Sequence, residues 1–135
     1  MMEKIDETIS DYFKDEKGII AVLLFGSQAV NAARPFSDID IAIVADHASI
    51  DVVKKNFDQY ALNLSRVLRK DIHLVMLNFA TESLSSQVFK KGRCLIVQNR
   101  REFSVFKMNM LTKIADFSYH KKQMQAGFIK HLMEA

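Results

Sequence analysis

Two short and largely apolar runs, at positions 19–25 and 39–44, constrain the fold of this chain most strongly. Both are rich in β-branched residues, and the first contains no polar residue at all. A strand of this composition is buried on both faces, so helices must cover a small sheet from both sides. The sequence therefore predicts the α/β (α+β) fold class, with helices around one small sheet.

Helical periodicity around these runs supplies the covering layers. A first amphipathic helix carries Ile5 and Phe13 and ends before Gly18. The further expected elements are a short helix at about 27–33, a loop at 34–37, a helix at about 50–68, a strand at 71–77, a helix at about 81–91, a strand at 94–97 and a long helix from 101 onward. We expect one domain over residues 1–135, with a core at 19–97 and a C-terminal helical extension at about 101–134.

Composition limits the class of protein. The chain has 135 residues, of which 49% are hydrophobic and 26% charged, as in an ordinary globular domain. The N-terminal segment is polar, and the longest apolar run is shorter than the roughly 20 residues that cross a bilayer. One cysteine, Cys94, excludes an internal disulfide, and its apolar neighbours predict a small core residue. We expect a cytoplasmic protein with no membrane partner.

Charge is distributed unevenly. Residues 93–135 hold eight of the 19 Lys and Arg residues but only three of the 16 Asp and Glu residues. Such a basic segment could meet an acidic partner, or it could be a solvated helix face. Basic motifs interleaved with aromatic residues, as in common RNA-binding modules, are absent from the sequence, so we expect no direct nucleic-acid binding.

Two carboxylates with one residue between them, Asp38 and Asp40, open the second apolar run. Side chains at i and i+2 of a strand point to the same face, so these two like charges lie close together. Their repulsion destabilises the fold unless a cation neutralises them. A hard divalent ion such as Mg²⁺ suits oxygen ligands of this kind. Asp71 begins the next strand and is expected to supply a third carboxylate, and three aspartates can hold two metal ions.

Gly26 and Ser27 follow the first run directly. A strand that turns through glycine towards a helix directs backbone N–H groups and a hydroxyl at an anion, so this bend is expected to bind phosphate. The chain has no GxxxxGK[ST] motif and is therefore not a P-loop protein. A phosphate-binding bend beside a metal-binding carboxylate pair indicates phosphoryl or nucleotidyl transfer.

Gly26-Ser27, ten residues and then Asp38-Ile-Asp40 form a pattern that resembles the GSx10DxD signature of the polymerase-β-like nucleotidyltransferase superfamily. The short chain is similar to the minimal nucleotidyltransferase (MNT) group within it. The resemblance implies a polymerase-β-like fold, in which a small mixed sheet is flanked by helices and followed by a long C-terminal helix. It also implies ATP as substrate and two Mg²⁺ ions. It further implies an antitoxin of a HEPN/MNT toxin–antitoxin pair, which transfers AMP to a tyrosine hydroxyl of a HEPN ribonuclease toxin.

The resemblance also implies a role for each residue that matches the signature. Gly26 and Ser27 would hold the β- and γ-phosphates, and Asp38, Asp40 and Asp71 would bind the metals, with Asp71 also helping to activate the attacking hydroxyl. Many relatives have a basic residue and a further glycine after Gly-Ser, where this chain has Gln28 and Asn31. Further phosphate contacts are therefore assigned to Arg34 and Ser37.

Alternatives remain open at this point. The protein could be an antitoxin that inhibits its toxin by stoichiometric binding, or it could modify a small molecule such as an aminoglycoside, working as a homodimer. The last helix has apolar residues at three- and four-residue steps, including Phe103, Phe117 and Phe128. It could either dock a partner or pack on the sheet.

Overall fold

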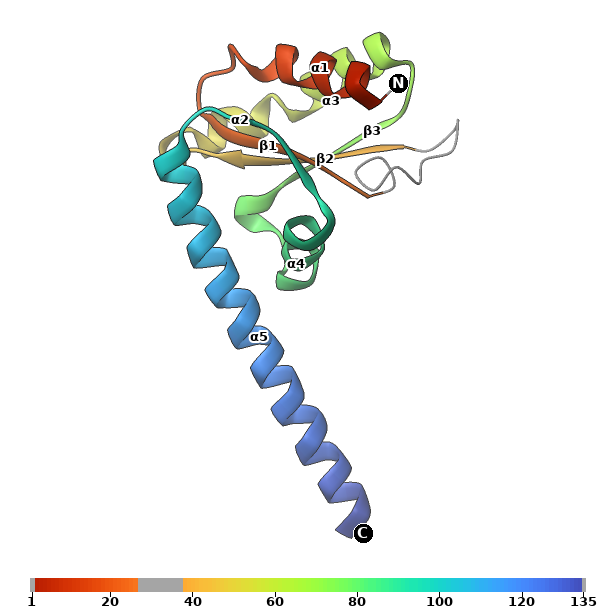
Figure 1. Ribbon diagram of the computed structural model, residues 1–135, viewed down its shortest axis with the longest axis vertical. Coiled ribbons are helices and arrows are strands. Elements are labelled where there is room, and N and C mark those ends of the chain that lie inside the picture. The colour runs from red at the N-terminus through yellow and green to blue at the C-terminus, as the bar shows by residue number, and fades with distance from the viewer. Residues whose placement is uncertain (1, 27–37, 135) are drawn as a thin grey trace.

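The computed structural model describes residues 2–26 and 38–134, which form a compact α/β head and one long projecting helix (Figure 1). A four-stranded mixed sheet in the order β3-β2-β1-β4 forms the centre of the head. The elements in chain order are α1 (Met2–Phe13), β1 (Ile19–Phe25), β2 (Ile39–Ala45), the 3₁₀ turn η2 (His47–Ser49), α2 (Ile50–Lys55), α3 (Phe57–Leu68), β3 (Ile72–Met76), the 3₁₀ turn η3 (Leu77–Phe79), α4 (Glu82–Lys91), β4 (Arg93–Val97) and α5 (Arg100–Glu134). The predicted fold class is confirmed.

The two apolar runs are the two central strands, as their composition requires. β1 pairs antiparallel with both β2 and β4, whereas β2 and β3 run parallel because the α2–α3 crossover joins them. All seven residues of β1 are buried, and of the described β2 residues only Asp40 is partly exposed. Burial of this kind stabilises the fold by about 25 cal/mol for each square ångström of apolar surface removed from water.

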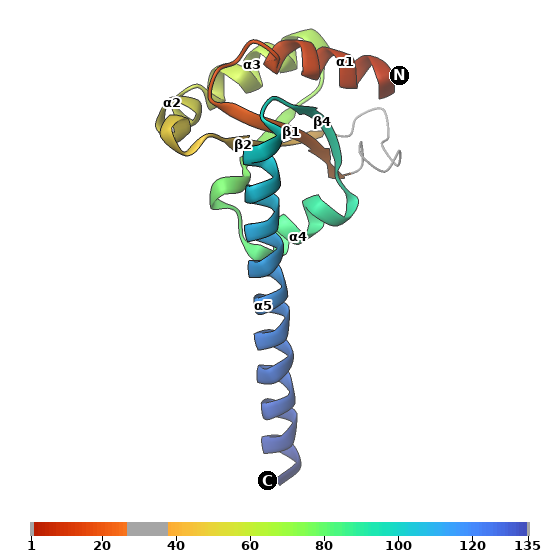
Figure 2. The ribbon, with the colours of Figure 1, turned by 60° about the vertical axis from the view of Figure 1, so that its left-hand side comes forward.

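Alternating side chains of the central strands pack into two separate hydrophobic cores, one on each face of the sheet. Ile39, Ile41 and Ile43 of β2 pack with α1 and α3, whereas Ala42 and Val44 face α4 and the beginning of α5. Figures 1 and 2 show α1 and α3 together on one side of the sheet and α4 on the other. Asp40 precedes Ala42 and Val44 at two-residue steps, so its side chain belongs to the face that α4 and α5 cover.

Two details differ from the expectation. The helix expected over 50–68 is divided at Asn56, whose backbone (φ −93°, ψ 1°) leaves the helical range while its N–H donates to the carbonyls of Val52 and Val53. This ends α2 and allows α3 to begin in a new direction. Cys94, expected in the core, is exposed on β4, because β4 is an edge strand and its residues are only partly covered.

The C-terminal helix α5 has 35 residues and is therefore about 50 Å long. Phe103 and Phe106 pack against the α4 side of the sheet, and Met110 is buried. After Ile114, every residue to Glu134 is exposed, and Figures 1 and 2 both show this part of the helix extending away from the head. Of the two readings left open above, packing on the sheet therefore applies only to the first turns. Among the described helices, none combines the length and the apolar character needed to cross a membrane.

Candidate active site

The site is built where β1 ends beside the beginning of β2. The antiparallel register places Phe25 opposite Asp40, so Gly26 follows directly at the edge of the carboxylate. Gly26 has φ +73°, and a Cβ added there would overlap the Asp40 Oδ2 atom. Both the left-handed backbone and the close approach require glycine at this position. The structure thus brings together the glycine of the expected phosphate bend and one of the expected metal ligands.

The alternation of side chains along β2 keeps Asp38 and Asp40 accessible while the residue between them is buried. Ile39, between them, is fully buried among the residues that α1 and α3 cover. Asp40 points the other way and keeps 27% of its side chain exposed, and Asp38, just before the strand, is exposed. The carboxylates therefore remain accessible to a ligand, while the isoleucine anchors the backbone that carries them.

A residue that the sequence reasoning missed lies beside this pair. The parallel register of β2 and β3 sets His73 opposite Asp40, and the His73 Nδ1 atom lies 3.2 Å from Asp40 Oδ1. Asp40 thus has one oxygen towards Gly26 and the other towards an imidazole. His73 is 67% exposed, so it faces the solvent at the edge of the site. The sequence could have indicated this position, because His73 follows Asp71 by two residues and two such side chains point to the same face of a strand.

Asp71 lies beside the start of β2, as expected. Its carbonyl accepts a hydrogen bond from the Ile39 N–H at 2.9 Å, which fixes the start of β3 beside β2. Yet within residues 2–26 and 38–134, no three Asp, Glu, His or Cys side chains are grouped so that they could hold a metal ion. The structure therefore shows no preformed set of three carboxylates, and the metal-binding role expected for Asp71 beside Asp38 and Asp40 stays a prediction. The register places His73, not Asp71, directly opposite Asp40.

Three other site residues expected from the sequence, Ser27, Arg34 and Ser37, lie outside the described residues, as do the short helix and the loop expected over 27–37. Their proposed phosphate contacts remain predictions.

The β1 end of the site is supported from β4. Arg93 pairs opposite Leu24 and forms a 2.8 Å ion pair with Asp6 of α1, in which both side chains are about one-third exposed. This link fixes α1, β4 and the last residues of β1 together, next to Gly26. The site glycine is therefore carried on backbone that is held from both sides.

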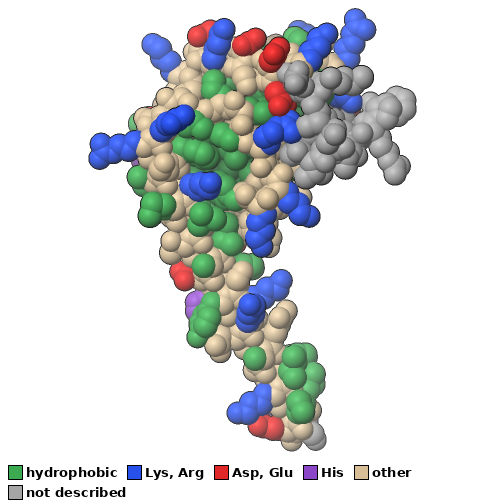
Figure 3. Space-filling view, viewed as in Figure 1, with side chains coloured by type: hydrophobic (Ala, Val, Ile, Leu, Met, Phe, Trp, Pro, Cys, Tyr) green, Lys and Arg blue, Asp and Glu red, His purple; other side chains and the backbone are tan. Residues whose placement is uncertain are grey.

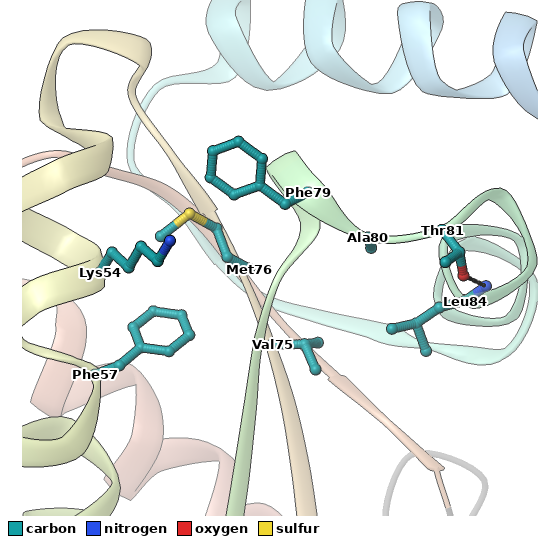
Figure 4. Close-up of a pocket in the computed structure, with 8 residues that line it drawn as sticks. All are labelled: Lys54, Phe57, Val75, Met76, Phe79, Ala80, Thr81 and Leu84. Carbon is teal, nitrogen blue, oxygen red and sulfur yellow. Dashed lines mark hydrogen bonds between the residues drawn. The ribbon is translucent and has the colours of Figure 1, made fainter.

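An apolar pocket of ≈ 440 Å³ opens along the edge strand β3, beyond His73 (Figure 4). Its lining comes from α2, α3, β3, η3 and α4: Lys54, Phe57, Val75, Met76, Phe79, Ala80, Thr81 and Leu84. The Lys54 Nζ atom lies 5.8 Å from the centre of the Phe79 ring, and the Thr81 hydroxyl accepts the Leu84 N–H as the cap of α4. The pocket offers apolar contact area rather than reactive groups. Phe79 also lines a second hollow with Phe106 and Met110, so this apolar surface continues to α5.

Two groups elsewhere in the molecule have shifted pKa values. Burial raises the pKa of Tyr60, and the nearby Glu16 carboxylate raises it further. Burial of the sulfur also raises the pKa of the Cys94 thiol, against an opposing effect of Lys107. Both shifts disfavour the anion, so neither group is prepared to act as a nucleophile.

Comparison with known proteins decides the family. Residues 7–101 match the family model described as "Polymerase beta, Nucleotidyltransferase". The chain belongs to this nucleotidyltransferase family. The match contains Gly26, Asp38, Asp40 and His73, and it ends at the first residues of α5. A search among curated proteins finds no significant match.

Chains of known structure share the fold of this nucleotidyltransferase over nearly its whole length. One, from a toxin–antitoxin with AMP-PNP, is 20% identical with a TM-score of 0.69, and the alignment covers 96% of this chain and 99% of that chain. Another, from a complex of a tri-AMPylated Shewanella oneidensis HEPN toxin with its MNT antitoxin, is 22% identical with a TM-score of 0.63 and coverages of 98% and 99%. A third, from the toxin–antitoxin MntA–HepT, is 22% identical with a TM-score of 0.61 and coverages of 97% and 98%. At these identities the likeness shows the fold, α5 included.

The donor atoms at the site suit the divalent metal that such a nucleotidyltransferase implies. Mg²⁺ in nucleotide sites is held by one or two carboxylates together with phosphate oxygens and water, without a complete shell of protein ligands. Asp38 and Asp40, accessible at one edge of the sheet and beside a glycine bend, satisfy this requirement. The missing third carboxylate therefore does not remove the metal site.

Proposed function

We propose that this protein is an antitoxin that transfers AMP from ATP to a tyrosine hydroxyl of a HEPN toxin and so neutralises it. The observation that carries the proposal is the contact between the Gly26 backbone and the Asp40 carboxylate. A triphosphate bound at Gly26 would therefore lie beside the carboxylate oxygens of Asp40, which can bind its metal ion. The family match supports nucleotidyl transfer, and the fold shared with chains of HEPN–MNT complexes supports the choice of partner.

In this reaction the tyrosine oxygen attacks the α-phosphorus of ATP, the bond from that phosphorus to the bridging oxygen breaks, and pyrophosphate leaves with the electron pair. Gly26 keeps its proposed contact with the phosphates through its backbone, while its missing side chain leaves room for the Asp40 carboxylate. Asp38 and Asp40 would hold two Mg²⁺ ions, which when bound offset negative charge on the phosphates and the leaving group. Ser27, Arg34 and Ser37 keep their proposed phosphate contacts. Asp71 keeps its proposed role as acceptor of the hydroxyl proton, which requires no place among the metal ligands.

The same proposal takes residues 1–135 as one nucleotidyltransferase domain, with its core at 19–97 and the helical extension at about 101–134 as the docking surface. The extension is favoured because its distal part displays apolar side chains to solvent on an otherwise unpartnered helix, as Figure 3 shows along α5. The exposed apolar residues of this part are Phe117, Tyr119, Met124, Phe128, Ile129, Leu132 and Met133. An isolated helix with this composition is stabilised when a partner covers it. Because the proposed reaction uses ATP and Mg²⁺, we expect it to take place in the cytoplasm.

The experiment combines purified protein, ATP labelled on the α-phosphate, Mg²⁺ and the product of the neighbouring gene. We expect label on the partner with the wild type and none with the double variant Asp38→Ala and Asp40→Ala. Asp51→Ala is the matched control, because this aspartate lies in the first turn of α2 and not at the sheet edge that carries the site. Equal labelling by the double variant and the wild type would exclude the proposed site.

The exposed distal part of α5 also favours a second candidate, an antitoxin that acts by binding alone. In that case the aspartate double variant forms the complex and still neutralises the partner. Under the first proposal the double variant forms the complex but no longer neutralises it. Toxicity measured with the two proteins expressed together separates these outcomes.

A further inference from the structure

The imidazole of His73 lies beside the Asp40 carboxylate, at the solvent-exposed edge of the site. Asp40 and His73 are directly opposite each other in the parallel β2–β3 pair, and both side chains emerge on the face that α4 covers. Their Oδ1 and Nδ1 atoms are 3.2 Å apart. Among the described residues, this is the one hydrogen-bond or ion-pair contact found for the His73 side chain. The rest of the ring is exposed.

The distance between these two atoms is close to the distance between neighbouring ligands of one metal ion. Neighbouring ligands of an octahedral ion with bonds of about 2.1 Å are about 3 Å apart. An Asp40 oxygen and a His73 nitrogen at 3.2 Å could therefore become neighbouring ligands of one ion with little movement. Since each side chain is fixed by its own strand, the pair is preorganised by the sheet rather than by a loop.

We propose that His73 supplies a nitrogen ligand to a metal ion that Asp40 binds, and that the site therefore prefers Mn²⁺ to Mg²⁺. Mg²⁺ takes oxygen ligands almost exclusively, whereas imidazole nitrogen is a good ligand of divalent transition metals. Exchanging a third carboxylate for a neutral imidazole also leaves two negative charges at the site instead of three, which weakens the hold on a hard cation. The inference rests on the proposed metal site but not on the identity of the acceptor.

The test measures metal binding on the full chain, without the transfer reaction. Mn²⁺ is titrated into the protein and followed by electron paramagnetic resonance, in which pulsed measurements detect nitrogen bound to the ion. The variants are His73→Asp, His73→Ala and the control His47→Ala, whose exposed imidazole lies on the turn beyond the far end of β2. Asp38→Ala with Asp40→Ala identifies the Mn²⁺ that belongs to this site. Circular dichroism checks folding, which replacement of an exposed side chain should leave intact.

We expect a nitrogen signal in the wild type and in His47→Ala, and its loss in His73→Asp and His73→Ala. Competition with Mg²⁺ should show that His73→Asp lowers the preference for Mn²⁺ over Mg²⁺ by about tenfold or more. Aspartate-dependent Mn²⁺ binding without a nitrogen signal would overturn the proposal, as would an unchanged metal preference in His73→Asp or an absence of Mn²⁺ binding by the wild type. A nitrogen signal together with no AMP transfer would leave this inference standing and refute the proposed function.

Discussion

The contact between Gly26 and Asp40 gives the sharpest prediction. Gly26→Ala forces an alanine into a left-handed backbone at φ +73°, which costs about 1–2 kcal/mol of folding free energy. The new methyl group would also overlap Asp40 Oδ2 and must displace that carboxylate by about 1 Å, and such a displacement can lower a catalytic rate by about 100-fold. We therefore expect a modest loss of stability and a much larger loss of nucleotidyl transfer.

A second glycine offers a matched control. Gly18 also has a positive φ, +88°, and a Cβ there would overlap Ser49, far along β1 from the carboxylates. Gly18→Ala should cost a similar amount of stability but leave transfer unchanged under conditions where the protein is fully folded. Urea denaturation gives the free energy of unfolding, and transfer of label from ATP gives the rate. Equal rates for the two alanine variants would refute the reasoning.

Three further predictions concern other parts of the molecule. Ser85 is fully buried and its hydroxyl has no hydrogen-bond partner among the described residues, so Ser85→Ala should raise the free energy of unfolding by about 1 kcal/mol in urea denaturation. Phe128 is 64% exposed, so Phe128→Asp should change stability by less than about 0.5 kcal/mol, yet weaken binding of the partner in calorimetric titration. The pKa of Tyr60 is raised in the folded protein, so the tyrosine of the unfolded chain ionises first as the pH rises past 10.0. The free energy of unfolding of the wild type should therefore fall above this pH by up to about 1.4 kcal/mol per pH unit relative to Tyr60→Phe. Urea denaturation across that pH range measures this difference.

The main elements of the fold could be predicted because local composition determined them. The apolar run 19–25 can be stable only as a covered strand, and it is the fully buried β1. The break at Asn56 was missed because neither proline nor glycine marks it, and the backbone leaves the helix at an ordinary residue. The exposure of Cys94 was missed because the sequence does not reveal which strand lies at the edge of the sheet.

The site was predictable only as far as neighbours in sequence determine it. Asp40 lies on β2 and Asp38 directly precedes this strand, whereas Gly26 directly follows β1, which pairs with β2. The prediction of a shared site therefore needed only one antiparallel pair. The third position depends on the register between parallel strands joined by a long crossover, and this register is not fixed by a short turn as it is in a hairpin. Asp71 was chosen because it is acidic, whereas the pairing of Asp40 with His73 places an imidazole there.

The positions of α5 and the carboxylates limit how the proposed partner can be held. Both belong to the same side of the sheet, since Ala42 and Val44 continue the Asp40 face towards Phe103 and Phe106. They lie at opposite ends of β1, because Gln98, two residues before α5, donates to the Ile20 carbonyl, whereas Gly26 follows the other end of the strand about 20 Å away. Apolar side chains continue from Phe103 and Phe106, which seat α5 on the head, to Phe117 and resume at Met124 in the exposed part, so a partner could bind along this part of α5. A partner bound there must therefore present its tyrosine on a segment that crosses α4 to reach the sheet edge, and a compact acceptor limited to α5 could bind but would not be modified.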